Sequence, residues 1–182
     1  DEDKDKEVFA LRPMTCPFQY QAYLNEMRSY RDLPLRYSET STLFRNESSG
    51  EMHGLIRVRQ FTISEGHLMC LPEQLEEEFK SCLELAIYML KTLGLYEDVS
   101  YRFSQWDPAD KEKYIGTEEQ WNEAQGIMKK ILDNLEIPYV IGVGEAAFYG
   151  PKLDIQIKNV FGKEDTIVTI QIDMLLAEKF GM

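Results

Sequence analysis

The segment RNESSGEMHGLIRVRQF, residues 45–61, places two arginines on either side of a Ser-Ser-Gly turn. Two extended arms joined by a turn predict a hairpin, and Arg45 and Arg57 on these arms can converge over one face. An arginine in a strand needs water or an anion for its charge, and guanidinium groups bind phosphate oxygens in pairs. The pattern is typical of a triphosphate site, although solvated arginines that balance acidic neighbours fit the spacing equally well.

Two further residues fall on the same face of this predicted hairpin. Glu47 lies two residues after Arg45, and Phe61 lies four residues after Arg57. Side chains at even spacing in a strand point to the same face. A carboxylate accepts a hydrogen bond from an exocyclic amine such as that of adenine, and a phenyl ring stacks on a flat base. One sheet face could therefore bind a nucleotide from its phosphates to its base.

Cys16 and His67 are zinc-binding residue types, but they lie far apart in the sequence. Zinc usually takes three or four protein ligands, so the pattern alone favours a buried cysteine and a hydrogen-bonded core histidine. Cys70 and Cys82 are expected in the core, and an odd number of cysteines without a framework spacing argues against disulfides. The other histidine, His53, is expected in an exposed loop.

The composition favours one ordinary globular domain, residues 1–182, with 43% hydrophobic residues. The formal net charge of −12 argues against broad nonspecific binding of nucleic acid. No apolar run has the length of a membrane span, and the charged start does not resemble a signal peptide, so a cytoplasmic protein without membrane contact is expected. Residues 1–7 are expected to form a solvated, frayed lead-in.

Periodicity predicts an α+β fold, with an antiparallel β-sheet flanked by helices. The helix beginning at Thr117 opens with a capping-box pattern that ends at Gln120. The predicted helices cover residues 17–31, 71–94 and 117–137, and the predicted strands cover residues 33–47, 55–62, 99–105, 139–145, 152–162 and 166–174.

FRNESSGEMHGLIRVRQF resembles motif 2 of the class II aminoacyl-tRNA synthetases, in which an arginine, a glutamate two residues later and a variable loop precede an arginine and a phenylalanine four apart. RPMTCP, RSYRDLPLR, HGLIRVRQFT and AFYGPKLD follow the order seen in the threonyl members of that class. The resemblance covers residues 10–176, although RSYRDLPLR alone would also fit the prolyl enzymes. It implies the class II catalytic fold in part.

The resemblance implies a role for each matching residue in the nucleotide site. Arg45 matches the arginine that holds the ATP α-phosphate and the amino-acid carboxylate, and so acts catalytically by stabilising charge during adenylate formation. Glu47 matches the residue that reads adenine. Arg57 matches the residue near the γ-phosphate, and Phe61 matches the ring that stacks on adenine.

For the amino acid, the resemblance implies a zinc site and a threonine pocket. Cys16 and His67 match two of three protein ligands of a Zn2+ ion, and the third, a histidine, is expected outside this chain. That metal binds the amino and hydroxyl groups of threonine, which excludes valine. Tyr149 and Gln171 match residues that line the pocket, and Lys152 is expected to add positive charge near it.

Two segments depart from the resemblance. CPFQ, residues 16–19, stands where many relatives have Cys-Pro-Gly-His, and TISEGH, residues 62–67, stands where many have Thr-Gln-Asp-Asp-Ala-His. Glu65 thus replaces an aspartate that contacts the threonine side chain, and Ile63 replaces a glutamine. An added methylene displaces a carboxylate in a small pocket. Threonine is the expected substrate, with a prolyl-like or divergent specificity as the alternative.

The resemblance also implies Mg2+ with ATP, and L-threonine, tRNA(Thr) and a second protein copy as partners of the full-length protein. Segments matching motifs 1 and 3 are missing, so we expect a truncated catalytic core that is a poor or inactive synthetase alone. A non-catalytic module that binds an amino acid, a nucleotide or a partner is one alternative. A zinc-free structural domain with surface arginines is another.

Overall fold

The computed structural model describes residues 8–182, and the chain divides into two compact units, Asp1–Leu71 and Pro72–Met182. The expectation of a frayed lead-in concerns residues 1–7, which lie outside the described residues. That residues 1–182 form a single domain stays a prediction. Among the helices of residues 8–182, none combines the length and the apolar composition that a membrane crossing requires.

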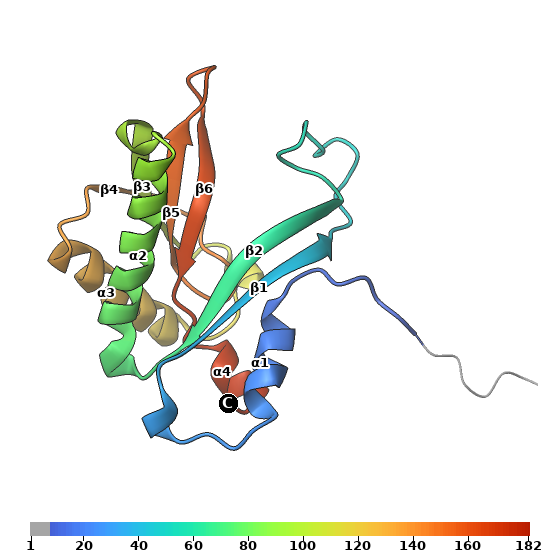
Figure 1. Cartoon of the computed structure of the whole chain (residues 1–182), viewed down its shortest axis with the longest axis vertical. Helices are drawn as coiled ribbons and strands as arrows, with labels where there is room; N and C mark the ends of the chain where they lie inside the picture. Colours follow the sequence, from blue (N-terminus) through green and yellow to red (C-terminus); the bar gives the residue numbers. More distant parts are fainter. Residues whose placement is uncertain (1–7) are drawn as a thin grey trace, which may run out of the picture. The chain divides into compact units, whose positions relative to one another are not determined.

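The first unit is built on an antiparallel hairpin of β1 (Leu35–Phe44) and β2 (Gln60–Met69) (Figure 1). It also contains α1 (Cys16–Leu24) and the 3-10 turn η1 (Tyr30–Asp32). The helix predicted over residues 17–31 is wrong beyond Leu24. Met27 is almost fully exposed, so the apolar spacing does not continue a buried face, and Ser29 starts a separate capped turn.

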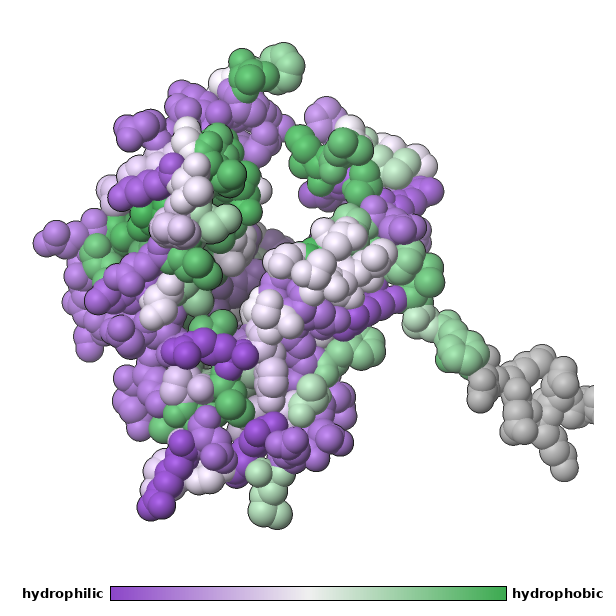
Figure 2. Space-filling model, in the orientation of Figure 1, coloured by the Kyte–Doolittle hydropathy of each residue, from purple (hydrophilic) through white to green (hydrophobic). Residues whose placement is uncertain are grey.

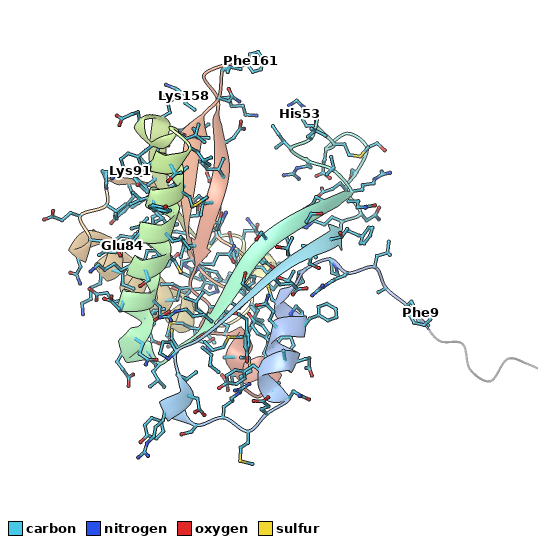
Figure 3. All side chains as sticks on the ribbon, viewed as in Figure 1. Phe9, His53, Glu84, Lys91, Lys158 and Phe161 are labelled. Atoms are coloured by element: carbon cyan, nitrogen blue, oxygen red, sulfur yellow. The ribbon has the colours of Figure 1, made fainter. Side chains whose placement is uncertain are left out.

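The second arm of the hairpin lies further along the chain than predicted. The alternation of residues 55–62 predicted a strand, but residues 55–59 belong to the loop and β2 starts at Gln60. A bridge between His53 and Arg57 folds this loop back on itself, and Leu55 and Ile56 are largely exposed. His53 is exposed, as predicted, and lies in this loop (Figure 3). Exposed and partly buried side chains alternate instead within residues 60–69, the residues of β2.

The second unit contains a four-stranded sheet in the order β4-β3-β5-β6, which confirms the α+β fold class. Its strands are β3 (Val99–Gln105), β4 (Tyr139–Val143), β5 (Lys152–Lys158) and β6 (Glu164–Gln171), and its helices are α2 (Leu75–Thr92), α3 (Glu118–Asn134) and α4 (Leu176–Phe180). Three 3-10 turns, η2 (Pro72–Gln74), η3 (Tyr96–Asp98) and η4 (Lys111–Lys113), lie between them. The sheet is not wholly antiparallel, because β4 pairs with β3 in parallel. A parallel pair needs a long crossover, which α3 provides.

One core joins the two long helices of this unit to the middle of its sheet. Leu153 and Ile155 of the central strand β5 are fully buried. Phe79, Leu83 and Leu90 repeat at helical spacing, so they lie on one face of α2 and share a core with Leu153 and Ile155, as the apolar pattern predicted. The core is completed by Ala86, Tyr101, Phe103, Met128, Ile131, Leu132 and Ile172.

Strand β5, which pairs with β6 in a hairpin, ends at Lys158 and not at residue 162 as predicted. Val160 and Phe161 are almost fully exposed at the tip of this hairpin, where hydrophobic side chains stand out (Figures 2 and 3). The Asn159 side chain accepts hydrogen bonds from the backbone N–H of Phe161 (2.9 Å) and of Lys163 (3.1 Å). An asparagine that binds its own following backbone in this way closes a turn, which ends the strand at Lys158.

The predicted capping box is confirmed, and it predicts a stability change. The Thr117 hydroxyl accepts a hydrogen bond from the Gln120 N–H, and the Gln120 side chain accepts one from the Thr117 N–H. Thr117→Ala removes one of these bonds and should lower the free energy of unfolding by about 1 kcal/mol. Urea denaturation checks this, with the exposed Glu123→Ala of the same helix as control. Equal stability of both variants would contradict the capping role.

Candidate functional site

Arg45 and Phe61 lie at the loop end of the β1–β2 hairpin. Arg45 directly follows β1, and its backbone N–H donates to the carbonyl of Arg59 at 2.9 Å. Its guanidinium carbon lies 5.1 Å from the centre of the Phe61 ring, within the range of a cation–π contact. Arg45 is exposed and Phe61 is half-buried. A positive charge and an aromatic ring therefore lie side by side where solutes can reach the arginine.

Glu47 and Arg57 form a second pair in the loop at the same end of the hairpin. Arg57 Nη1 lies 3.5 Å from Glu47 Oε2, and 55% of the Arg57 side chain is exposed against 17% of Glu47. Arg59 Nε donates to the Glu47 carbonyl at 2.9 Å, which ties the two sides of the loop together. The expectation that all four residues share a strand face is wrong, because β1 ends at Phe44 and not at residue 47, so that Arg45, Glu47 and Arg57 lie outside the two strands and only Phe61 lies on one.

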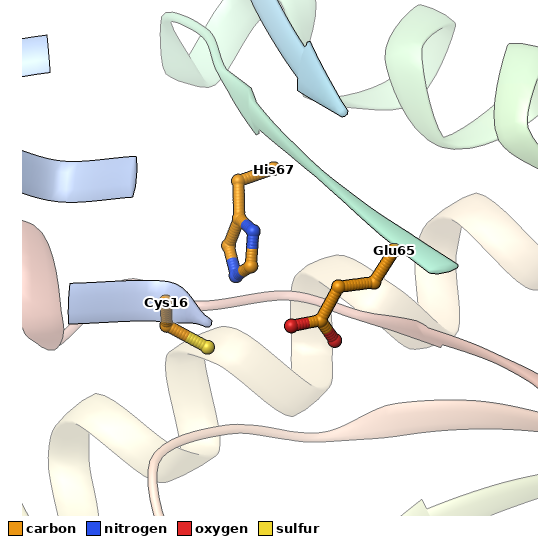
Figure 4. A group of neighbouring side chains, drawn as sticks. All are labelled: Cys16, Glu65 and His67. Carbon is orange, nitrogen blue, oxygen red and sulfur yellow. The ribbon is translucent and has the colours of Figure 1, made fainter. Parts of the chain in front are cut away.

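Three donor groups meet at the other end of the hairpin's half-buried face. Cys16 is the first residue of α1, and Glu65 and His67 lie two residues apart on β2. One ligand atom from each lies within 4.8 Å of the other two (Figure 4). We call these residues the three-donor group. Thiolate, imidazole and carboxylate are all zinc ligands, so the set fits that metal.

The electrostatics of the three-donor group depend on its neighbours in the same unit. Burial, and then the negative charge of Glu39, raises the pKa of the Glu65 carboxyl above its ordinary value. His67 Nδ1 lies 2.8 Å from Gln19 Oε1, and the far ring nitrogen Nε2 faces Cys16 and Glu65 (Figure 4). The ring is thus oriented with one nitrogen toward the possible metal.

The sequence did not predict Glu65 as a possible metal ligand. It placed Glu65 in the threonine pocket, because the resemblance has an aspartate there. The signal was present in the spacing, since residues 65 and 67 of one strand point to the same face. That signal required β2 to be extended through His67, and the predicted strand ended at Thr62.

The three predicted pocket residues of the second unit lie together at one end of the β5–β6 pair. Lys152 is opposite Gln171 in the strand register, and the Tyr149 hydroxyl donates to the Gln171 side-chain oxygen. Lys152 Nζ lies 2.8 Å from a carboxylate oxygen of the buried Asp154. The structure therefore brings Tyr149, Lys152 and Gln171 together, and the lysine charge is paired within the strand.

Gly150 holds this corner because its backbone approaches the chain of Ile172 closely. A Cβ atom at Gly150 would lie 2.0 Å from the Ile172 carbonyl oxygen. Gly150→Ala must therefore move the backbone and should cost about 3 kcal/mol of unfolding free energy. Gly126→Ala is the matched control, because it lies inside α3 with no atom within 4 Å, and it should stabilise slightly. Equal urea midpoints for the two variants would contradict this explanation.

Comparison with known proteins places the chain in a family. The family model of the tRNA synthetase class II core domain (G, H, P, S and T) matches residues 1–182. The chain is 69% identical over its full length to the threonine–tRNA ligase of Clostridium botulinum (strain Eklund 17B / Type B) and 65% identical to that of Clostridium perfringens (strain SM101 / Type A). It spans 28% of the length of each of these relatives.

A solved structure is similar in both sequence and fold. It is the crystal structure of the RNA binding domain of threonyl-tRNA synthetase from Cryptosporidium parvum Iowa II, with a TM-score of 0.85 and 34% identity. The match covers 94% of this chain and 41% of that one. These similarities confirm the predicted resemblance to threonyl-tRNA synthetases and the predicted fold. The chain belongs to the family of the tRNA synthetase class II core domain.

Proposed function

We propose that the whole protein joins threonine to tRNA(Thr) through a threonyl-adenylate made from ATP, in the cytoplasm and as a homodimer. One observation carries the proposal: a single hairpin has an arginine and an aromatic ring at one end and the three-donor group at the other. Phe61 and His67 lie six residues apart on β2, which is about 20 Å at 3.3 Å per residue. A nucleotide and an amino acid can lie end to end over that length.

At the loop end of the hairpin, the proposed ligand is ATP with Mg2+. Arg45 binds the α-phosphate and stabilises the charge that develops as pyrophosphate leaves. Glu47 accepts a hydrogen bond from the adenine amine, Phe61 stacks on the base, and Arg57 binds the γ-phosphate. Mg2+ neutralises the phosphate oxygens.

Binding of ATP in this way requires the Glu47–Arg57 pair to separate. Exposed ion pairs contribute about 0–1 kcal/mol, so the separation costs little. The contact between Arg45 and Phe61 is similarly weak, at about 0.5–1 kcal/mol for an exposed cation–π pair. A triphosphate that forms charge-assisted bonds to both arginines outweighs these two losses.

At the other end, the proposed ligand is Zn2+, held by Cys16, Glu65 and His67, so that the histidine expected from outside this chain would be a fourth protein ligand. When bound, the ion supplies a positive charge for the amino and hydroxyl groups of threonine. A site that binds a hydroxyl rejects valine strongly, because valine leaves that position unpaired. That ligand from outside this chain stays a prediction. Tyr149, Lys152 and Gln171 remain the proposed threonine-pocket residues.

The experiment that tests this function is amino-acid-dependent exchange of pyrophosphate into ATP by the whole protein. We expect exchange with threonine, and little with valine or proline. Exchange driven by proline would favour the prolyl-like alternative. ATP binding in isothermal titration without exchange for any amino acid would instead indicate a non-catalytic binding module.

A further inference from the structure

Among the α1 residues around the His67 ring, Gln19 determines where the ring proton lies. Gln19 Oε1 is 2.8 Å from His67 Nδ1, and the Tyr20 ring packs edge-on against the imidazole at 5.6 Å between centroids. A carbonyl oxygen only accepts hydrogen bonds, so the neutral ring must carry its proton on Nδ1. The lone pair is then on Nε2, which faces Cys16 and Glu65 (Figure 4).

The orientation of the Gln19 amide is itself determined by a charged residue on β1. Gln19 Nε2 donates to Glu39 Oε2 at 3.4 Å, so its amide oxygen is the end that faces His67. Glu39 Oε1 in turn lies 2.6 Å from Arg12 Nη1. The Arg12 guanidinium lowers the pKa of the Glu39 carboxyl, so Glu39 stays an acceptor at neutral pH.

Gln19 is also well placed to hold this orientation. It is only 6% exposed, so water competes weakly for its amide. The contacts therefore form a series in which each residue orients the next, from Arg12 through Glu39 and Gln19 to His67. Each of these contacts pairs a donor with an acceptor, which leaves one consistent arrangement of protons along the series.

We propose that Gln19, oriented by Glu39, is a positioning residue that keeps His67 as the Nδ1–H tautomer with Nε2 available to a metal. This inference deepens the proposed function, since it rests on the three-donor group as the metal site. A histidine ligand that donates its other ring N–H to a fixed acceptor gains basicity and orientation, and loss of such an acceptor weakens metal binding about 10- to 100-fold.

The tautomer can be read without any metal, by long-range nitrogen–proton NMR of the labelled, metal-free chain. The chain has two histidines, so the exposed His53 serves as an internal reference. The spectra are recorded at about pH 8.5, well above the ordinary histidine pKa of about 6.5. We expect Nδ1–H for His67 in the unaltered chain, loss of that preference in Gln19→Leu, and a smaller loss in Glu39→Ala.

A second readout is Zn2+ affinity, measured against a competing chelator. Gln19→Leu should weaken it about 10- to 100-fold. Gln21→Leu makes the same substitution at an exposed site of the same helix, and it should change neither the tautomer nor the affinity. This control separates the loss of the amide from any general effect of leucine on α1.

The two readouts distinguish failure of this inference from failure of the proposed function. A proton on Nε2 of His67 in the unaltered chain, or an unchanged tautomer in Gln19→Leu, would overturn the positioning role. If His67 carries its proton on Nδ1 but the chain binds no Zn2+, the positioning of His67 stands and the metal site is refuted. If Gln19→Leu does not fold, Glu39→Ala decides, because it changes an acceptor on the strand and leaves α1 intact.

Discussion

Cys16→Ala should abolish stoichiometric zinc binding by this chain. The thiolate is one of three donors, and the carboxylate and imidazole that remain are too few for a stable zinc site. Because loss of an outer partner alone costs about 10- to 100-fold in affinity, loss of a direct ligand should cost more than about 100-fold. Elemental analysis of protein purified without added metal measures the zinc content.

Cys82→Ala is the control for this experiment. Cys82 is also a half-buried thiol, but it lies on α2 and outside the three-donor group. The control variant should keep the zinc content of the unaltered chain. Zinc retained by Cys16→Ala, or lost by Cys82→Ala, would show that the metal site is not built on Cys16.

Arg45→Ala should cause the largest loss in the nucleotide reaction. Charge-assisted hydrogen bonds contribute about 1.5–3 kcal/mol each, so ATP affinity should fall by roughly 10- to 150-fold. In the whole protein, pyrophosphate exchange should fall by about 100- to 1,000-fold in kcat, as for other groups that stabilise developing charge. Isothermal titration and exchange kinetics measure the two effects.

Two further variants isolate the cause of that loss. Arg45→Lys keeps the charge but loses the guanidinium fork, so its activity should lie between those of Arg45→Ala and the unaltered protein. Arg31→Ala makes the same change in net charge at an exposed arginine of η1, which contacts Tyr30. It should leave ATP binding unchanged. Equal losses of ATP binding in Arg31→Ala and Arg45→Ala would mean that the change in net charge causes the loss, and not the position of Arg45.

The sequence predicted the elements whose pattern comes from a buried face. The residues of α2 repeat at helical spacing because one side of the helix packs on the core, and the capping box of α3 is a local interaction. Such features depend on neighbours in the sequence or on a single apolar face. They can therefore be read without knowing the tertiary structure.

The errors arise where the pattern has another physical origin. Residues 55–59 alternate like a strand, yet Leu55 and Ile56 are exposed and the segment is part of a loop. The parallel pairing of β3 and β4 is a long-range contact that no local pattern encodes. Glu65 was missed as a possible metal ligand because the predicted strand ended at Thr62. Gln19 was missed as a partner of His67 because only the fold brings α1 to β2.

The resemblance, by contrast, selected residues that the structure brings together, but it did not specify their contacts. It selected Arg45, Glu47, Arg57 and Phe61 as one group, and the structure places them at one end of one hairpin as two contacting pairs. Their contacts with each other depend on side-chain directions that a motif does not specify. That these residues bind ATP stays a prediction.

The proposed function requires that the three-donor group binds a metal and that this metal in turn recognises threonine. The most direct test replaces zinc with Co2+, whose visible absorption reports on its ligands, and then adds amino acids. We predict a thiolate-to-cobalt absorption band that disappears in Cys16→Ala, and a visible spectrum that changes with threonine but not with valine. A spectrum without the thiolate band, or one that responds equally to threonine and valine, would contradict the claim.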